Sequence, residues 1–322
     1  MRFIVYGVGA VGGVIATALA HSGAEVIGVA RGARLDAIRS EGLTLRSPKG
    51  TIHARFDGAG SAREIDVRPD DAILLVVKGQ DTQAALEDLR NAGVEDQPVF
   101  CAQNGVANER TTLRYFPNVH GINVMLPAQY TEPGETIAWC SPNYGNFDIG
   151  RFPNGTDAAD EALAQALTAS GIGGYPQSEV MIYKYGKLIM NLNNIVEAAL
   201  GRDVEASDLA EHLRAEGRAV MDAAGIAWRD VADSDPRRVH MKNGTVEGVI
   251  RLGGSTSQSL SRAAGSIETD YINGEISFLG RLNGIPTPAN DFVSRLANRL
   301  ARNVTGIGSI TRDDLAREMG LT

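Results

Sequence analysis

The sequence predicts an α/β chain in two parts, in which a parallel β-sheet comes first and an all-helical part follows. The first observation is the order of elements at the N-terminus: an apolar strand at 2–6, a glycine-rich turn, an apolar helix and a second strand at 25–29. The second is a pair of continuous apolar runs at 71–77 and 98–102, typical of strands buried on both faces. The third is the chain beyond Ser178, where nearly every segment has helical periodicity.

The glycine-rich turn has the pattern of a dinucleotide-binding loop. It consists of Gly7, Val8, Gly9, Ala10, Val11 and Gly12, a G-x-G-x-x-G sequence between a strand and a helix. Gly7 permits a tight turn, Gly9 lets a pyrophosphate approach the backbone, and Gly12 lets the helix pack closely on the strand. The phosphates then bind N–H groups at the helix N-terminus. We therefore predict a Rossmann domain; the alternatives are a turn that binds nothing and a signal peptide, whose apolar run would not be broken by glycines.

Arg31 follows the second strand, and Arg34 stands three residues later. NAD sites usually have an acidic residue here, which bonds the ribose 2′-OH. A guanidinium instead suits a 2′-phosphate, by its charge and by its fork of donors. The two arginines therefore predict NADP (NADPH) as the cofactor. The alternative is that Arg31 is only a solvated loop charge.

Length and composition limit the remaining classes. The 322 residues suffice for two domains, and we place the boundary after the Gly/Pro cluster at 171–176, with an NADP-binding domain at 1–178 and a helical substrate domain at 179–322. A net charge of −8 argues against a nucleic-acid partner, and no apolar run is long enough for a membrane span. The cysteines Cys101 and Cys140 form no metal or disulfide motif. We expect a cytoplasmic enzyme without a metal.

Lys78 and Asn104 follow the two buried strands. Because ligands of open α/β sheets bind outside the carboxyl ends of strands, both residues are candidates for contact with the cofactor. Each could also be a polar residue that merely opens a loop, and Asn104 with Gly105 could be only a turn.

The helix expected at 180–200 carries a polar stripe of Lys184, Lys187, Asn191 and Asn194, at spacings of three, four and three. Polar groups on an otherwise apolar helix are costly unless they have a use, which indicates a site; the alternative is a solvated face. Lys184 lies near the helix start, where we expect a flanking charge.

Further helices are expected at 209–224, 236–251, 266–276, 290–302 and 311–319, the last capped by Thr311. Before the 266–276 segment, Ser255 and Thr256 are followed by Gln258, so Ser255 and Gln258 fit a capping box. The hydroxyls and N–H groups there could bind a substrate carboxylate. Capping without a ligand remains the alternative.

With these residues in view, the chain resembles the ketopantoate reductase (2-dehydropantoate 2-reductase) family over nearly its whole length. The motifs are the loop at 7–12, the strand ending in Lys78, Asn104 with Gly105, and Lys187 with Asn191. The most specific is Glu268-Thr269-Asp270-Tyr271-Ile272-Asn273-Gly274, since the family carries a nearly identical Glu-x-Asp-Tyr-x-Asn-Gly string.

The resemblance implies a two-domain NADPH enzyme that reduces ketopantoate to pantoate in a cleft between its domains. It implies that Lys187 is the general acid, that Glu268 helps to hold the substrate, and that Asn191 binds it. It also implies that Arg31 meets the 2′-phosphate and that Lys78 and Asn104 lie near the nicotinamide.

The chain departs from the family pattern in two places. Ile195 stands where the family often has a second Asn, which Asn194 would replace one position early, and Ser255-Thr256 stands for a Ser-Ser pair. Both departures fall in expected substrate contacts. They leave open a related NADP-dependent reductase of another 2-oxo acid or carbonyl compound. An NADP-binding regulatory protein without turnover is the third reading. The partners expected are a small 2-oxo acid and, as an open question, a second copy in a homodimer.

Overall fold

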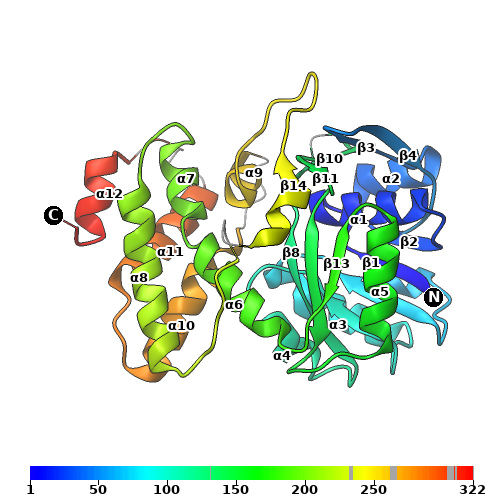
Figure 1. Ribbon diagram of the computed structural model, residues 1–322, viewed down its shortest axis with the longest axis horizontal. Coiled ribbons are helices and arrows are strands. Elements are labelled where there is room, and N and C mark those ends of the chain that lie inside the picture. The colour runs from blue at the N-terminus through cyan, green and yellow to red at the C-terminus, as the bar shows by residue number, and fades with distance from the viewer. Residues whose placement is uncertain (131, 232–234, 262–266, 303–307, 309, 322) are drawn as a thin grey trace. The chain divides into compact units, whose positions relative to one another are not determined.

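A computed structural model describes residues 1–130, 132–231, 235–261, 267–302, 308 and 310–321. The chain separates into two compact units, whose elements are labelled in Figure 1. The first unit comprises 1–103, 107–183 and 233–249, and the second comprises 104–106, 184–232 and 250–322. The division at Tyr183 falls inside a helix rather than after Ser178, where we expected it, and the 233–249 segment belongs to the first unit.

The first unit is built on a sheet of eight strands in the described residues, in the order β13-β12-β8-β7-β6-β1-β2-β5. Their bounds are β1 (Arg2–Tyr6), β2 (Val26–Val29), β5 (Asp57–Ala59), β6 (Asp71–Leu75), β7 (Val99–Cys101), β8 (Val119–Met125), β12 (Asn146–Arg151) and β13 (Gly173–Pro176). Neighbouring strands are parallel, apart from the antiparallel pair β8 and β12. The predicted Rossmann-type parallel sheet is confirmed.

Helices cover both faces of this sheet (Figure 1). Phe3 and Val5 of β1 pack in one apolar cluster with α1 (Ala10–His21) and α5 (Ala158–Ala169). Ile4 and Tyr6, which point to the other face, pack in a second cluster with α3 (Thr82–Asn91). Because both faces of β1 are buried, its sequence is a continuous apolar run. The shorter helices are α2 (Gly32–Ser40), α4 (Asn108–Thr112), η1 (Ala62–Glu64) and η2 (Gly79–Asp81).

The Gly/Pro cluster that we expected to mark the domain boundary is the edge strand β13. A Cβ at Gly174 would lie 2.6 Å from the backbone of Ala164 on α5, so glycine is needed where the helix packs on this strand. A second sheet has the order β4-β3-β10-β9, with β3 (Leu43–Ser47), β4 (Gly50–Ala54), β9 (Ala128–Gln129) and β10 (Glu135–Ala138). No pattern predicted β3 or β4.

The helix expected at 236–251 is absent from the structure, and that expectation was wrong. The segment forms a short 3-10 helix, η3 (Pro236–His240), and then the strand β14 (Met241–Asn243), which pairs antiparallel with β11 (Cys140–Pro142). A partner a hundred residues away in the sequence satisfies this backbone, and local periodicity cannot reveal such a partner.

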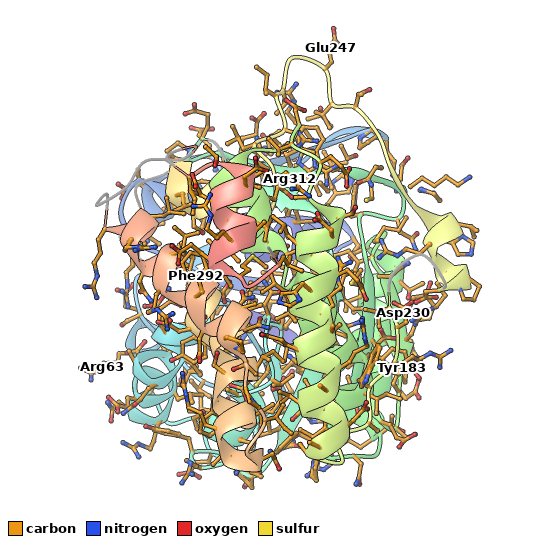
Figure 2. All side chains as sticks on the ribbon, turned by 90° about the vertical axis from the view of Figure 1, so that its left-hand side faces the viewer. Arg63, Tyr183, Asp230, Glu247, Phe292 and Arg312 are labelled. Carbon is orange, nitrogen blue, oxygen red and sulfur yellow. The ribbon has the colours of Figure 1, made fainter. Side chains whose placement is uncertain are left out.

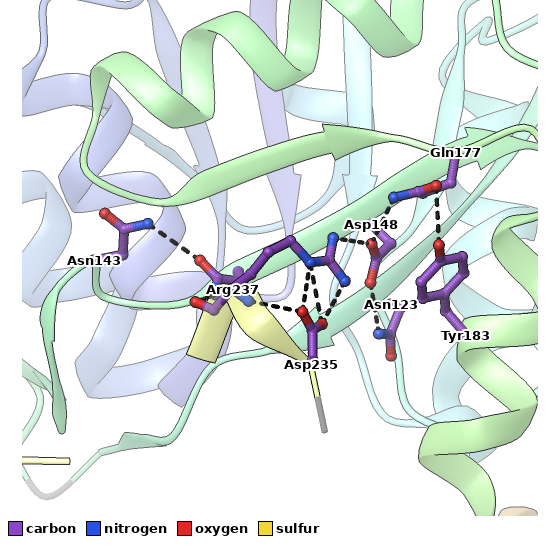
Figure 3. A network of polar contacts seen from close by, with 8 residues as sticks. Asn123, Asn143, Asp148, Gln177, Tyr183, Asp235 and Arg237 are labelled. Carbon is purple, nitrogen blue, oxygen red and sulfur yellow. Dashed lines mark hydrogen bonds and ion pairs between the residues drawn. The ribbon is translucent and has the colours of Figure 1, made fainter. Parts of the chain in front are cut away.

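A polar network fixes the same segment to the first unit (Figure 3). Arg237 Nη1 donates to Asp148 Oδ1 at 2.5 Å, and Arg237 Nη2 donates to Asp235 Oδ2 at 2.6 Å. Asp148 lies on β12 with 2% of its surface exposed, and it also accepts hydrogen bonds from Asn123 and Gln177. Burial would lower the pKa of Arg237, but its hydrogen bonds to Asp235 and Asp148 outweigh that effect and raise it.

The second unit is helical in its described residues. It contains most of α6 (Val180–Asn191) and also α7 (Asn194–Leu200), α8 (Ser207–Ala223), α9 (Ser255–Ser261), η4 (Glu268–Tyr271), α10 (Asn273–Asn283), α11 (Pro288–Ala301) and α12 (Arg312–Glu318). Thr311 caps α12, as expected, because its hydroxyl accepts from the Asp314 N–H at 3.1 Å. Arg312, labelled in Figure 2, donates to Asp208 on α8 at 2.6 Å. Phe292, also labelled there, is buried on α11.

Candidate functional site

The glycine-rich loop lies between the carboxyl ends of three neighbouring strands. Gly7 has φ +109°, and its N–H donates to the Val29 carbonyl at the end of β2, at 3.1 Å. A Cβ at Gly7 would lie 2.9 Å from the Val77 backbone, which follows β6. The turn and the close approach to both neighbours therefore require glycine.

The surroundings of the other two glycines suit the roles that the motif predicts. A Cβ at Gly12 would lie 2.1 Å from the Gly7 carbonyl oxygen, so any side chain there would push helix α1 away from the turn. Around Gly9 the described residues leave open space, with no atom within 4 Å of a Cβ position. An exposed backbone at the N-terminus of α1 suits an approaching pyrophosphate, so the loop residues Gly7, Val8, Gly9, Ala10, Val11 and Gly12 fit a dinucleotide.

Arg31 and Lys78 lie at the same edge of the sheet as this loop. Arg31 is exposed and directly precedes α2, beyond the end of β2. Lys78 is half-buried and follows β6, at the start of η2. Both are placed where a bound dinucleotide could reach them.

Arg34, which we had grouped with Arg31, has a different environment. Only 6% of its surface is exposed, and its Nη1 donates to the carbonyls of Pro133 and Glu135 at 2.8 and 3.0 Å. Its Nε donates to the Val8 carbonyl at 3.1 Å. A guanidinium held in this way is not available to a 2′-phosphate, so the preference for NADP depends on Arg31 alone.

In the second unit, the polar stripe does not lie on a single helix. The expected helix at 180–200 is broken after Asn191, so Lys184, Lys187 and Asn191 share α6, whereas Asn194 begins α7. Lys187 and Asn194 are half-buried, and Asn191 is 8% exposed. Lys184 is 3% exposed, so the expectation of a solvated flanking charge was wrong. Glycine at Gly186 lets α6 approach the Arg229 carbonyl, because a Cβ there would lie 1.7 Å from that oxygen.

The break in the helix involves a residue whose role the sequence did not reveal. Asn273 is 1% exposed, and its Nδ2 donates to the Leu192 carbonyl at 3.0 Å and to Asn290 Oδ1 at 2.9 Å. Asn273 belongs to the same string as Glu268, which begins η4 and is half-buried. This bond therefore attaches the string of Glu268 to the end of the helix that carries Lys187.

Asn104 is part of the second unit, although it follows strand β7 in the sequence. The next residue, Gly105, has φ +79°, and a Cβ there would lie 2.7 Å from the Tyr271 carbonyl oxygen. The Asn-Gly pair is thus a tight turn that packs on the string of Glu268. Within this unit, the residue that follows Asn104 therefore approaches the end of the 3-10 helix that Glu268 begins.

Ser255 and Thr256 begin α9, with Ser255 exposed and Thr256 6% exposed. The expected capping box was wrong, because Ser255 is the first residue of α9 and not the residue that caps it; Gln258 Nε2 donates to the Gly253 carbonyl at 3.2 Å. Instead, Glu197 Oε1 on α7 accepts from the Gly254 N–H at 2.8 Å. A carboxylate of the protein itself thus occupies the helix end at which we considered a substrate carboxylate.

Among the described residues, His120, Asp157 and Asp160 bring three ligand atoms within 4.8 Å of one another. These groups are already bonded inside the protein. His120 Nδ1 pairs with Asp160 Oδ1 at 2.8 Å, and Arg151 donates to Asp157 Oδ2 at 2.7 Å. Asp157 and Asp160 form the capping box at the start of α5, so the helix cap and these bonds explain why the three side chains lie together.

A glycine-rich loop with the dinucleotide-binding pattern on a parallel sheet, followed by a helical unit with half-buried Lys187 and Glu268, is typical of two-domain nicotinamide-dependent oxidoreductases. Two family models match most of the chain: "Ketopantoate reductase PanE/ApbA" at residues 3–154 and "Ketopantoate reductase PanE/ApbA C terminal" at residues 182–301. The chain belongs to the ketopantoate reductase PanE/ApbA family.

Individual relatives agree with this assignment. A 2-dehydropantoate 2-reductase of Caulobacter vibrioides is 28% identical over 316 residues, covering 92% of this chain and 98% of the relative. A PanE/ApbA family ketopantoate reductase of Ralstonia eutropha has a crystal structure that matches with a TM-score of 0.76 at 27% identity, covering 94% and 99% of the two chains. A D-mandelate dehydrogenase bound to NADH and anilino(oxo)acetate shares the fold, with a TM-score of 0.76 at 23% identity and coverage of 94% and 99%.

No helix in the described part of the chain is both long and apolar enough to span a bilayer.

Proposed function

We propose that this protein reduces the carbonyl of a 2-oxo acid to a 2-hydroxy acid with NADPH, and that the substrate is 2-dehydropantoate (ketopantoate), which becomes pantoate. The observation that carries the proposal lies in the second unit. There the family string with Glu268 is bonded through Asn273 to the end of the helix that bears Lys187 and Asn191. Arg31, exposed beyond β2, supports NADP over NAD.

The roles follow from the chemistry of the residues. The reduced nicotinamide supplies the hydride when it is bound. Negative charge then grows on the carbonyl oxygen of the substrate, and the Lys187 ammonium stabilises that charge and donates the proton. Glu268, in the string that is bonded to the end of the same helix, is the residue proposed to help hold the substrate. Asn191, Asn194, Ser255 and Thr256 are the proposed substrate contacts, and Lys78 and Asn104 the proposed contacts near the nicotinamide.

A second candidate is the reduction of a different 2-oxo acid or carbonyl compound. Ile195, on α7, is 1% exposed and stands where the family often has an asparagine, so this chain lacks a polar group at that position. The D-mandelate dehydrogenase with anilino(oxo)acetate indicates that this fold accommodates other 2-oxo acids. A homodimer and a cytoplasmic location stay predictions, and light scattering of the purified protein tests the first.

A panel of 2-oxo acids, assayed by oxidation of NADPH, tests both candidates. Ketopantoate should give the highest kcat/KM. If another 2-oxo acid is better by tenfold or more, the second candidate replaces the first. If no carbonyl compound is reduced while NADPH binds, the protein is the regulatory NADP-binding protein of the third reading.

The choice of acid is tested by comparing Lys187→Ala with Lys184→Ala at saturating NADPH. Loss of a positioned acid should lower kcat by about a hundredfold or more in Lys187→Ala, without weakening NADPH binding. Because Lys184 is also buried, its variant needs a check of folding by circular dichroism. If a folded Lys184→Ala variant loses activity while Lys187→Ala keeps it, the assignment of the acid is wrong. Glu268→Ala should mainly raise KM, and its effect should not add to that of Lys187→Ala.

A further inference from the structure

We propose that Arg34 is a positioning residue that holds the dinucleotide loop in its binding conformation from the side opposite the ligand. This inference rests on the proposed use of a nicotinamide dinucleotide, but not on the identity of the substrate. It concerns residues of the first unit alone. Arg34 lies in the first turn of α2, three residues after the exposed Arg31.

The Arg34 guanidinium joins the loop to the second sheet. Its Nε donates to the Val8 carbonyl inside the loop at 3.1 Å, while its Nη1 donates to the Pro133 and Glu135 carbonyls, at the start of β10, at 2.8 and 3.0 Å. The guanidinium also lies over the ring of Tyr130, 4.7 Å from its centroid. With a longer bond from Nη1 to the Glu132 carbonyl at 3.5 Å, one planar fork therefore holds four carbonyl groups, which a lysine ammonium could not do in the same geometry.

The bond to Val8 acts on the shape of the loop. Since the peptide unit is planar, fixing the direction of the Val8 carbonyl also fixes the N–H of Gly9. That N–H donates to the Gly7 carbonyl at 3.0 Å and closes the turn. The arginine thereby determines the backbone direction at the exposed glycine that a pyrophosphate approaches.

Thr136, on β10 itself, makes a second link to the same region. Its hydroxyl donates to the Ala10 carbonyl, in the first turn of α1, at 3.1 Å. A Cβ at Gly13 would lie 2.3 Å from Arg34 Nη2 and 3.0 Å from the Thr136 hydroxyl, so the helix backbone packs directly on both side chains. Arg34 Nη2 is buried and has no hydrogen-bond partner among the described residues.

The charge of Arg34 adds to this effect. Burial lowers the pKa of Arg34 to about 10, so the group still carries its proton at neutral pH. Arg34 contacts carbonyl oxygens and an aromatic ring, and no carboxylate pairs with it among the described residues. A buried cation behind the loop favours an anion in front of it, because the field is weakly screened inside a protein.

Binding measurements separate this role from direct recognition of phosphate. We would titrate wild type, Arg34→Met and Arg34→Lys with NADP⁺, NAD⁺ and adenosine 2′-monophosphate, which lacks the pyrophosphate. Arg34→Met should weaken NADP⁺ and NAD⁺ by similar factors of about tenfold or more, which leaves their ratio unchanged, while adenosine 2′-monophosphate binds within twofold of wild type. Arg34→Lys keeps a charge but loses the fork, so it should give an intermediate loss.

Arg39→Met is the matched control. Arg39 lies on the same helix, is exposed, and bonds to Gly58 and Glu64. Its replacement should leave all three affinities within twofold. The proposal is overturned if Arg34→Met weakens NADP⁺ and adenosine 2′-monophosphate alike and spares NAD⁺, since Arg34 would then contact the 2′-phosphate. It is also overturned if none of the affinities changes.

Two further variants keep the test informative if Arg34→Met does not fold. Thr136→Val removes the second link and should weaken both dinucleotides by several-fold, again without affecting adenosine 2′-monophosphate. Gly13→Ala should weaken dinucleotide binding less in an Arg34→Lys background than in wild type; equal effects in both backgrounds contradict a direct contact. A wild-type protein that binds neither dinucleotide refutes both this inference and the proposed cofactor, whereas binding without turnover refutes only the proposed reaction.

Discussion

Asn273 donates its side-chain N–H to the main-chain carbonyl of Leu192, 3.0 Å away. Leu192 lies between the end of α6 at Asn191 and the start of α7 at Asn194. A carbonyl at a helix end needs a partner once the helical ladder stops, and Asn273 supplies one from the most specific family string. The 268–274 string is thus bonded to the break between α6 and α7, the two helices that carry the polar stripe.

Replacing Asn273 by Ala should reduce both stability and turnover. The variant leaves the Leu192 carbonyl without this donor, and Asn290 Oδ1 loses one as well. We expect a loss of about 2–3 kcal/mol in the free energy of unfolding, measured with urea, and a fall in kcat at a temperature where the variant is still folded. Asn283→Ala is the control, because its exposed bond to Leu279 lies at the other end of α10. Equal losses in the two variants would contradict a special role for Asn273.

Replacing Arg31 by Asp should shift the cofactor preference from NADPH towards NADH. The change removes a charge-assisted donor and adds repulsion, so kcat/KM for NADPH should fall by about 10- to 100-fold. Steady-state kinetics with both cofactors measure the shift, and Arg39→Asp, on the helix that Arg31 precedes, is the control. A wild-type enzyme that uses NADH and NADPH equally well would show that Arg31 does not recognise a 2′-phosphate.

Replacing Arg237 by Met should strongly destabilise the first unit. Asp148 would keep its buried position but lose its cation, and breaking such a pair costs about 3–5 kcal/mol. Urea unfolding followed by circular dichroism measures the loss. The exposed pair of Arg55 and Glu41 gives the comparison, since Arg55→Met should change the free energy by no more than about 1 kcal/mol. The double variant with Asp148→Asn should recover part of the lost stability.

Asp157 should make stability depend on pH in the acid range. Burial would raise the pKa of Asp157, but the charge of His120, the Ala159 N–H and Arg151 outweigh this and lower it. A lowered pKa means that the stabilisation is complete above the unfolded value of about 3.9 and disappears as the pH falls through the folded value. Near pH 7, Asp157→Ala should lower the free energy of unfolding by about 1 kcal/mol, because α5 loses its cap. Near pH 3 the difference in free energy of unfolding between this variant and wild type should become smaller.

Asp157→Asn separates the two contributions, since an amide oxygen still accepts from the Ala159 N–H. Urea midpoints at both pH values should place this variant between wild type and Asp157→Ala at pH 7. A gap that is the same size at both pH values would show that the charge of Asp157 does not contribute.

The elements that could be predicted from the sequence are those whose signals are local. Strand β1, the glycine turn and the cap at Thr311 depend on neighbouring residues, and the structure has them where the pattern places them. Strand β14 and the break at Leu192 depend on partners far along the chain, so helical periodicity predicted a helix at both places.

The candidate site divides in the same way. The motif predicts the loop at 7–12 as a binding site, and the resemblance predicts the roles of Lys187 and Glu268. The burial of Arg34 and Lys184 could not be seen from their spacing, because charged residues near a helix start are usually solvated. Only tertiary contacts distinguish the exposed Arg31 from Arg34, three residues away.

Because the 233–249 segment belongs to the first unit, the order in which the chain is synthesised affects how this unit folds. The ribosome synthesises β12, which contains the buried Asp148, some ninety residues before it synthesises Arg237. Until then Asp148 lacks the cation that pairs with it, and β11 lacks its hydrogen-bonding neighbour. We therefore expect the first unit to complete its fold only after strand β14 has been synthesised, and a chain truncated after α6 would lack part of that unit.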